Sequence, residues 1–353
     1  MALKRINYQG FRNLVDGELH FADDYNFIIG ENGAGKTNLL EAIFYVGLAS
    51  SFRARDEKNL ICSGKQFLRI DAETEEKNAF LYLDGNKKKL VLQGNEVRRL
   101  SEFIGWLGIT LLSIEDLWIV RGAPSKRRAF LDWAIAKISP AYLDNLIEYR
   151  KILRQRNKIL QSAHDNGKLD LLELFDEQMI KIGNEIYRER EKKISELKED
   201  IIKFSSEFGM KKFTLRYHST CPEMRLDHTV LKRVREKELI FGHTLVGPHR
   251  DDLLFFTNGH PLKHYASEGE ERAAAISLKL AESEMLYRKT KSRPVLLLDE
   301  AGAELDTVKK ETFLNLLKGQ IFYASTQAPR FIRKEGSACR VFSVKKGQIE
   351  VSA

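Results

Sequence analysis

The chain has 353 residues, a formal net charge of +8, 43% hydrophobic residues and 31% charged residues. This composition predicts a soluble globular protein of about two domains. It excludes a membrane protein, since no apolar run reaches the roughly 18 to 20 residues of a membrane span. The widely spaced Cys62, Cys221 and Cys339 follow no metal-ligand spacing, and no secretory signal precedes the first predicted strand. We therefore expect a cytoplasmic location.

The sequence pattern of the first 120 residues predicts mostly strands. Between two of them, Asp84-Gly85-Asn86 has the composition of a hairpin turn. Apolar and alternating runs predict strands at Leu3–Tyr8, Gly17–Phe21, Tyr25–Ile29, Phe67–Glu73, Asn78–Leu83 and Leu90–Leu92.

The segment Gly30–Thr37 fits the phosphate-binding pattern G-x-x-x-x-G-K-[ST], between a strand and a helix expected over Asn38–Leu48. Such a turn directs backbone N–H groups and a positive helix end at an anion. Lys36 would neutralise the β and γ phosphates of ATP, and the Thr37 hydroxyl would ligate Mg²⁺. The alternative is a chance glycine-rich turn. The expected nucleotide-binding residues are Gly30, Glu31, Asn32, Gly33, Ala34, Gly35, Lys36, Thr37 and Asn38.

The pattern changes at about residue 123, where long helices begin. Apolar residues at helical spacing predict helices over Ser125–Ile138, Pro140–Gln161 and Leu169–Phe208. At 1.5 Å per residue, the last helix would be about 60 Å long. Its dense Lys/Glu pattern is interpreted as a solvated face. Residues 123–210 are therefore expected to form an inserted, mostly helical arm.

Strands return after Gly209. Residues 1–122 and 211–353 are therefore expected to form one discontinuous α/β head domain. The further predicted elements are strands at Phe213–His218, Leu253–Phe256, Pro294–Leu298 and Ile321–Tyr323, and a helix over Glu270–Tyr287.

The apolar strand before residue 299 ends in two acids, a Walker B pattern. Asp299 would hold Mg²⁺ opposite Thr37, and Glu300 would polarise the attacking water as a general base. The second acid favours hydrolysis over static binding, because Mg²⁺ coordination needs only the first. Glu300 and Lys36 are the expected catalytic residues.

Ser267-Glu268-Gly269 begins a predicted helix about 30 residues before Asp299. This turn resembles the signature motif of ABC-type ATPases. In that family the serine hydroxyl and the helix N-terminus cap the γ-phosphate held by a second subunit, which implies roles for Ser267 and Gly269. The alternative is an ordinary serine N-cap.

Nearly the whole chain resembles the RecF family of SMC-like ATPases. The segments that carry this resemblance are Asn32–Glu41, Ser51–Arg53, Glu115–Leu117, Arg127–Asp132 and Thr244–Asp252. The resemblance implies an ABC-type P-loop head with mixed sheets and a short helical arm. It implies weak, DNA-stimulated ATP hydrolysis and ATP-dependent head-to-head dimerisation on double-stranded DNA at gaps or single-strand/double-strand junctions. It also implies recombinational repair and replication restart at the nucleoid, with RecR and RecO as partners and RecA loaded downstream.

The same resemblance suggests roles for residues outside the main motifs. Arg12 is expected near the nucleotide, with a structural salt bridge as the alternative. Glu115 stands at the Q-loop position and would sense Mg²⁺. His249 and Arg250 would form a hinge or a contact between subunits, and neither is assigned a role.

The chain departs from the family pattern in three places. Glu268, Glu270 and Glu271 stand near the signature glycine, where glutamines are usual, and would repel a γ-phosphate unless they point away or meet basic partners. Ala303–Asp306 lacks the usual D-loop serine. The position of the switch histidine holds Ser325–Gln327, side chains that can position water and are not bases near neutral pH.

Basic residues gather in three clusters that suit a polyanion such as DNA; solvated surface charge is the alternative. The clusters are Arg121 with Lys126–Arg128, Lys232–Lys237, and Arg288–Arg293. Which of them contacts DNA stays open. Two other classes of function are a transporter's nucleotide-binding subunit and a kinase-type phosphotransferase. The first has no helical arm, and the second needs an acceptor pocket but no Ser267-x-Gly269 motif.

Overall fold

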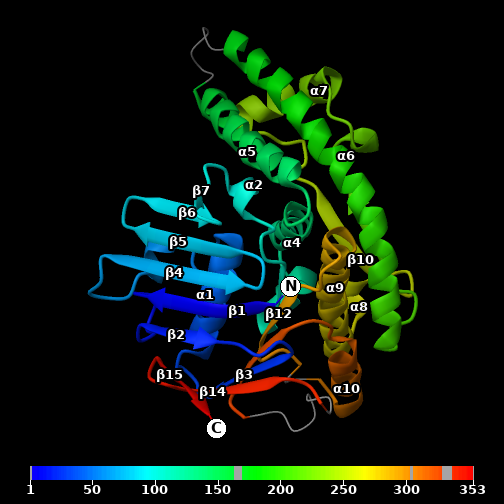
Figure 1. Cartoon of the computed structure of the whole chain (residues 1–353). Coiled ribbons are helices and arrows are strands. Elements are labelled where there is room, and N and C mark those ends of the chain that lie inside the picture. Colours follow the sequence, from blue (N-terminus) through cyan, green and yellow to red (C-terminus); the bar gives the residue numbers. More distant parts are fainter. Residues whose placement is uncertain (1, 163–168, 303–304, 328–335, 353) are drawn as a thin grey trace. The chain divides into compact units, whose positions relative to one another are not determined.

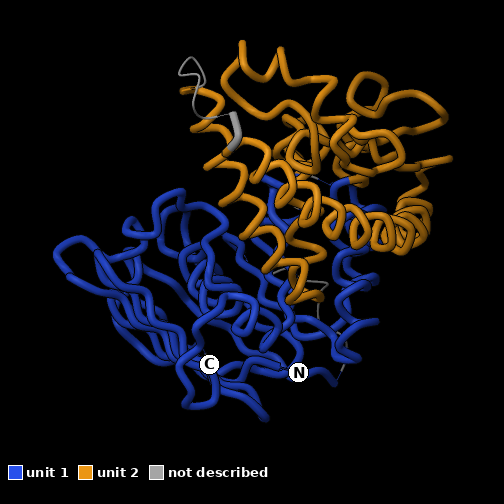
Figure 2. Tube along the Cα trace, turned by 90° about the horizontal axis from the view of Figure 1, so that it is seen from above, with its two compact units in different colours: residues 1–116, 275–353 blue, residues 117–274 orange. Residues whose placement is uncertain are grey.

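The fold is described from a computed structural model that covers residues 2–162, 169–302, 305–327 and 336–352. It divides into two compact units, residues 1–116 with 275–353 and residues 117–274 (Figure 2). The predicted turn at 163–168 and the D-loop residues Ala303 and Glu304 lie outside the described residues. No helix among the described residues is long and apolar enough to cross a membrane.

The first unit contains a mixed six-stranded sheet in the order β15-β14-β3-β13-β12-β8 (Figure 1). All its neighbouring strands are parallel except β14 and β15. Parallel strands bury both faces, which explains why β12 is a continuous apolar run. The strands are β15 (Gln348–Ser352), β14 (Cys339–Lys345), β3 (Tyr25–Gly30), β13 (Ile321–Ser325), β12 (Val295–Asp299) and β8 (Ile109–Ser113).

A second sheet of the first unit is antiparallel, in the order β2-β1-β4-β5-β6-β7. Along β4, buried and more exposed side chains alternate, as expected for strands with one face on the core. The predicted strands lie within two residues of the observed ends. The observed strands are β2 (Gly17–His20), β1 (Leu3–Gln9), β4 (Phe67–Thr74), β5 (Asn78–Asp84), β6 (Lys88–Leu92) and β7 (Asn95–Glu96).

Helix α1 (Lys36–Leu48) follows β3 directly and is buried along most of its length. The buried Trp106, which is not part of this helix, binds it through its indole N–H, which donates to the carbonyl of Val46 at 3.0 Å. The shorter helices of this unit include α2 (Leu100–Phe103) and α10 (Thr307–Leu316). Helix α1 therefore presents its N-terminus at a fixed place beside the mixed sheet.

The second unit contains the predicted arm helices. Figure 1 shows α5 and α6 side by side as an antiparallel pair. Helix α7 was not predicted; the Asp227 side chain caps it by accepting from the Val230 amide at 2.8 Å. The elements are α3 (Leu117–Arg121), α4 (Pro124–Ala136), α5 (Pro140–Gln161), α6 (Leu169–Glu207), β9 (Thr214–His218), α7 (His228–Phe241), β10 (Asp252–Thr257), β11 (His260–Pro261), α8 (Leu262–Tyr265) and the start of α9 (Glu268–Thr290).

This second unit is larger than the predicted arm. Residues 211–274, which were predicted to belong to the head, group with the arm helices. Arg190 of α6 explains part of this grouping: it is 1% exposed and donates to the Tyr217 hydroxyl at 2.7 Å and the Pro248 carbonyl at 2.8 Å. The chain returns to the first unit at Ala275, within α9, and not at residue 211.

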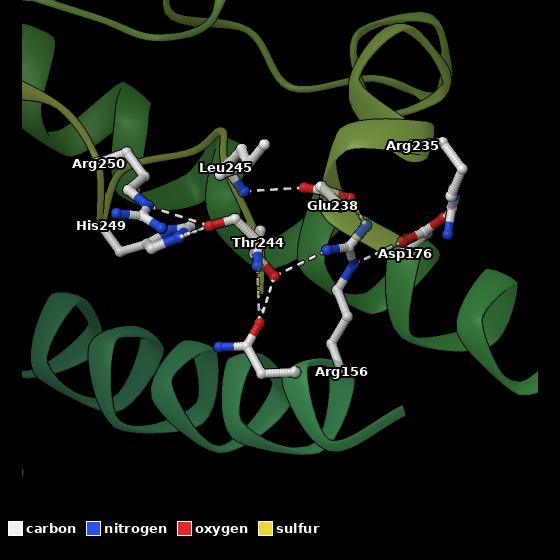
Figure 3. A network of polar contacts seen from close by, with 9 residues as sticks. Arg156, Asp176, Arg235, Glu238, Thr244, Leu245, His249 and Arg250 are labelled. Carbon is white, nitrogen blue, oxygen red and sulfur yellow. Dashed lines mark hydrogen bonds and ion pairs between the residues drawn. The ribbon is translucent and has the colours of Figure 1, made fainter. Parts of the chain in front are cut away.

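A buried ion-pair network joins α5, α6 and α7 (Figure 3). The Arg156 guanidinium donates to Asp176 at 2.8 Å, to Glu238 at 2.6 Å and to the Thr244 hydroxyl at 2.7 Å. The side chains of Arg156 and Glu238 are 0% exposed, and Arg235 also pairs with Asp176. A buried charge needs partners of opposite charge, so Arg156 holds three helices and the loop at Thr244 in one arrangement.

Candidate nucleotide-binding and hydrolysis site

Sheet topology brings the predicted site residues of the first unit to one edge. Strands β3, β12 and β8 run in the same direction, so their carboxyl ends share that edge. In the register, Asp299 lies opposite Ser113 of β8 and Ala324 of β13. The phosphate loop follows β3, and Glu115 follows β8. Open parallel sheets bind their ligands at this edge.

The phosphate loop depends on its glycines. Gly33 and Gly35 have φ angles of 79° and 120°, a region that side chains disfavour. A Cβ at Gly35 would also approach the side chains of Asn13 and Leu14 to 3.2 Å. The turn at the start of α1 is therefore available only to a glycine-containing sequence.

Lys36 bends back over this loop. Its ammonium group donates to the carbonyls of Gly30 at 2.9 Å and Glu31 at 3.0 Å, and its side chain is largely buried. A point charge held over a turn rich in backbone N–H groups favours binding of a polyphosphate. Phosphate oxygens would then replace the two carbonyls as its partners.

The two nucleotide motifs meet at one hydrogen bond. The Thr37 hydroxyl donates to Asp299 Oδ1 at 2.9 Å. Burial, and the neighbouring Glu300 carboxylate, raise the pKa of Asp299. Hydroxyl and carboxylate oxygens at this spacing fit the ligand preference of Mg²⁺, whose charge would favour the ionised carboxylate.

A cavity of about 390 Å³ opens at this edge, a volume within the range of small-ligand sites. Arg53 lines it and donates to the Asn38 side chain at 3.1 Å. Sequence reasoning assigned Arg53 no role, although it lies in a segment that resembles the family. The lining residues are Asn32, Gly33, Gly35, Lys36, Thr37, Asn38, Arg53, Ser113, Ile114, Glu115, Asp299 and Glu300.

The remaining predicted loop residues, Gly30, Glu31 and Ala34, line a second cavity of about 680 Å³. Asn32 and Gly33 line both cavities. The other wall of the second cavity comes from β14, with Val344 and Lys345 among its residues, and from the turn that follows β14. The phosphate loop thus separates two hollows of the same unit.

Arg12 lies in the structural salt bridge that was the alternative prediction. Its guanidinium donates twice to Glu41, at 2.9 and 3.0 Å, and once to the Asn59 carbonyl at 3.0 Å. Glu41 is fully buried in α1, so the pair neutralises a carboxylate that would otherwise lie in the core. Arg12 is not among the residues that line the first cavity.

Glu300 follows β12 with a positive φ of 53°, and its amide donates to the Ala324 carbonyl at 3.2 Å. At the switch position after β13, the Ser325 hydroxyl donates to the Gln327 carbonyl at 2.5 Å. No histidine is found at this position, as the sequence indicates. Glu300 is one of three carboxylates among the residues that line this cavity, together with Glu115 and Asp299.

The signature turn forms a capping box in the second unit. Glu270 accepts from the Ser267 amide at 2.8 Å and from its hydroxyl at 2.9 Å, while the Glu270 amide donates back to Ser267 Oγ at 3.3 Å. The other two acids meet basic partners: Glu268 pairs with Arg272 at 2.8 Å, and Glu271 pairs with Arg121. Both the serine N-cap and the basic partners foreseen for the altered signature are present.

Two arginines of the first predicted basic cluster have partners within the protein. Arg127 is largely buried and donates twice to Asp252, at 2.7 and 2.8 Å, and Arg128 donates to the Asp251 carbonyl at 2.8 Å. These two arginines fasten α4 to the start of β10. They are therefore less available to a phosphate backbone than exposed lysines and arginines.

His249 lies half-buried in the loop between α7 and β10. Its Nδ1 lies 3.0 Å from the Tyr149 hydroxyl and its Nε2 lies 3.4 Å from the Thr244 carbonyl. These partners fit a neutral ring that accepts at Nδ1 and donates at Nε2. Burial lowers the pKa of His249 to about 3.

Acidification should therefore destabilise the fold through His249. Below its ordinary pKa of about 6.5 the unfolded chain takes up a proton that the folded ring refuses, so stability is complete above pH 6.5 and falls toward pH 3. Between pH 7 and pH 5 this group should remove about 2 kcal/mol from the unfolding free energy. Urea unfolding at both pH values would show a smaller loss for His249→Asn than for the wild type. Equal losses in the two proteins would contradict the prediction.

Known proteins share this fold and these motifs. The family described as "RecF/RecN/SMC N terminal domain" matches residues 2–350. The chain is 33% identical over 359 residues to "DNA replication and repair protein RecF" of Lachnoclostridium phytofermentans, with 99% of each chain covered. It is 34% identical over 369 residues to the protein of that name from Bacillus cereus, covering 99% of this chain and 98% of the relative.

Solved structures of the same family are similar to this chain over its whole length. "The recombination mediator protein RecF-ATP in RecFOR pathway" has a TM-score of 0.89 at 31% identity and covers 100% of this chain and 98% of that chain. An Smc head bound to the C-winged helix domain of ScpA has a TM-score of 0.57 at 15% identity, covering 100% of this chain and 98% of that chain, a likeness of fold alone.

Fold and motifs together define an SMC-type ATPase head of the ABC class. Within that class, the chain belongs to the RecF family.

Proposed function

We propose that this protein is a DNA-binding ATPase of recombinational repair and replication restart, in which ATP binding joins two heads and hydrolysis separates them. The observation that carries the ATPase part is the Thr37–Asp299 hydrogen bond of 2.9 Å, between motifs 262 residues apart in sequence. It puts a phosphate loop, a hydroxyl and a half-buried carboxylate at one cavity, as Mg²⁺-dependent phosphoryl chemistry requires.

Each residue then has a definite task. The backbone of Gly30–Asn38 and the Lys36 ammonium bind the phosphates, and Lys36 stabilises the charge that develops on them during hydrolysis. Thr37 and Asp299 would hold Mg²⁺, and Glu115, which follows β8 and lines the same cavity, would sense the ion. The ion, when bound, would neutralise phosphate oxygens. Glu300 orients the attacking water and accepts its proton.

In the proposed dimer, the signature turn of one copy contacts the nucleotide bound to the other. Ser267 and Gly269 begin a helix whose N-terminus suits an anion, and we assign them to the γ-phosphate held by a second copy of the chain. Ser267 is exposed, as such a role needs. Two copies would enclose two ATP molecules, and the loss of γ-phosphates on hydrolysis would remove the groups that join them.

The DNA role rests on the relatives and on the charge of this chain. The relatives are named DNA replication and repair proteins, and the solved structures are assigned to the RecFOR pathway. A net charge of +8 suits a polyanion. We propose double-stranded DNA at gaps or single-strand/double-strand junctions as the substrate, RecR and RecO as partners, RecA as the protein loaded downstream, and a site of action in the cytoplasm at the nucleoid.

The transporter-subunit alternative shares the ATP chemistry but not the second unit. That unit devotes residues 117–274 largely to α4, α5, α6 and α7, and full-length RecF relatives match it. One experiment separates the functions: sedimentation of the protein with and without ATP, and its ATPase rate with and without duplex DNA. We expect an ATP-dependent dimer and a rate that DNA raises. A protein that stays monomeric with ATP, or whose rate ignores DNA, would refute the proposal.

The capping box should restrain this dimer. Glu270 places a negative charge on the Ser267 hydroxyl that we assign to a γ-phosphate, so Glu270→Gln should lower the ATP concentration for half-maximal dimerisation about threefold to tenfold. Sedimentation across an ATP series measures it. Glu76→Gln, an exposed site in the turn after β4, is the control with the same charge change. An unchanged midpoint in Glu270→Gln would show that this carboxylate lies away from the phosphate.

A further inference from the structure

The solvent face of α5 carries a stripe of basic side chains. Arg150 and Lys151 are 62% and 57% exposed, and Arg154 and Lys158 are also exposed. Positions 150, 154 and 158 are separated by four residues each and so follow one side of the helix. At 1.5 Å per residue they extend over about 12 Å, close to the width of the major groove of B-form DNA.

Within the described part of the chain, two of these four cations are paired and two are not. Lys151 pairs with Glu148 at 3.1 Å. Arg154 and Lys158 have no ion-pair partner among the residues that the structure describes. Arg150 lies 3.5 Å from Asp132, a carboxylate that already accepts from Arg190 at 2.7 Å. Arg154 and Lys158 therefore differ from Arg127 and Arg128, whose guanidinium groups bind partners inside the second unit.

A further cation is held rigidly beside α5. Three side chains of this helix hold the loop of residues 244–250. Arg156 donates to the Thr244 hydroxyl at 2.7 Å (Figure 3), and Asn157 accepts from the Thr244 amide at 2.9 Å. The Tyr149 hydroxyl lies 3.0 Å from His249 Nδ1. Arg250 in turn donates through Nε to the Thr244 carbonyl at 3.0 Å. Its terminal nitrogens have no partner among the described residues, so an already ordered guanidinium is left for a ligand.

The face also lacks apolar anchors. None of the strongly exposed large hydrophobic side chains of the described residues lies on α5. Helix α7 differs, because its basic residues adjoin Ile240 and Phe241, which are 80% and 61% exposed. Protein interfaces are centred on apolar anchors, whereas contacts to a phosphate backbone need only exposed cations and hydrogen-bond donors.

We infer that the basic face of α5 (Arg150, Lys151, Arg154 and Lys158), together with Arg250, is the surface of the second unit that binds the phosphate backbone of duplex DNA. This inference rests on the DNA-binding function proposed above. The contacts are to phosphates, so binding is independent of base sequence and weakens with salt. On this inference the DNA contacts of the second unit come from the basic face of α5. They do not come from Arg121 with Lys126–Arg128, or from Lys232–Lys237 of α7.

Fluorescence anisotropy of a labelled duplex, measured with the full chain and ATP across a series of salt concentrations, tests this surface. Neutralising two phosphate contacts should reduce the slope of log K against log salt by about 2 per chain in Arg154→Gln/Lys158→Gln. Affinity at 100 mM salt should fall about tenfold or more. Lys232→Gln/Lys237→Gln on α7 is the control, since it removes the same charge from an exposed helix of the same unit. It should keep the wild-type slope and affinity.

The outcomes are distinct. Wild-type affinity and slope in the α5 variant overturn the surface, and a loss confined to the α7 variant moves the contact to α7. A wild type that fails to bind duplex at low salt refutes the DNA-binding function itself, and the surface with it. Both variants should keep the wild-type ATPase rate without DNA, because none of the four positions lies in the nucleotide site. A fall in that basal rate for the α5 variant alone would instead assign the stripe a structural role.

Discussion

Replacing Glu300 by glutamine should abolish turnover while preserving the ATP-bound dimer. The amide cannot accept the proton of the attacking water, so the hydrolysis rate should fall about 100-fold or more. Lys36, Thr37 and Asp299 are untouched, so ATP still binds and the joined state should persist. Phosphate release measures the rate, and sedimentation with ATP measures the dimer.

Two control variants accompany the Glu300→Gln measurement. Glu76→Gln has the same change of charge outside every motif and should hydrolyse ATP at the wild-type rate. Lys36→Ala should lose nucleotide binding and therefore the dimer as well. If Glu300→Gln retained a third of the wild-type rate, Glu300 would not be the general base.

Arg156→Leu should destabilise the fold by about 3 to 5 kcal/mol. The substitution leaves Glu238 buried without its cation and removes one of the two partners of Asp176. Because the same guanidinium also binds Thr244, the loop that carries Arg250 should loosen. Chemical denaturation measures the change in unfolding free energy, and hydrogen exchange of residues 244–250 measures the loosening.

An exposed arginine supplies the matched comparison. Arg188 lies on α6, is 71% exposed and pairs with Glu185 at 2.9 Å. Arg188→Leu should change stability by less than about 0.5 kcal/mol, since exposed pairs contribute little. Similar effects of the two substitutions would mean that the Arg156 network contributes no more than a surface ion pair.

Local chemistry made the nucleotide motifs predictable. A phosphate loop needs glycines and lysine at fixed spacing, and an apolar run ending in Asp299 can be recognised as a buried strand. Their meeting could be expected as well, because parallel strands place their carboxyl ends on one edge. The hydrogen bond between Thr37 and Asp299 agrees with that expectation.

Partnerships between distant residues could not be predicted in the same way. Arg121 pairs with Glu271, which is 150 residues away in sequence, and Arg127 pairs with Asp252, which is 125 residues away. Periodicity says which face of a helix is buried, but not which carboxylate a buried arginine will meet. For the same reason the return to the first unit was placed at 211, although residues up to 274 group with the second unit and Arg190 binds Tyr217 and Pro248 within it.

The strand order of the mixed sheet has a consequence for biosynthesis. Strand β3 carries the phosphate loop, yet its neighbours on both sides, β13 and β14, begin at Ile321 and Cys339. Strand β3 is synthesised early, and about 300 further residues are translated before its neighbours exist, which takes roughly 15 to 60 seconds at typical translation rates. The second unit is continuous in sequence and can fold during this interval. ATP binding can therefore begin only after most of the chain has left the ribosome, so a truncated product cannot form a nucleotide site.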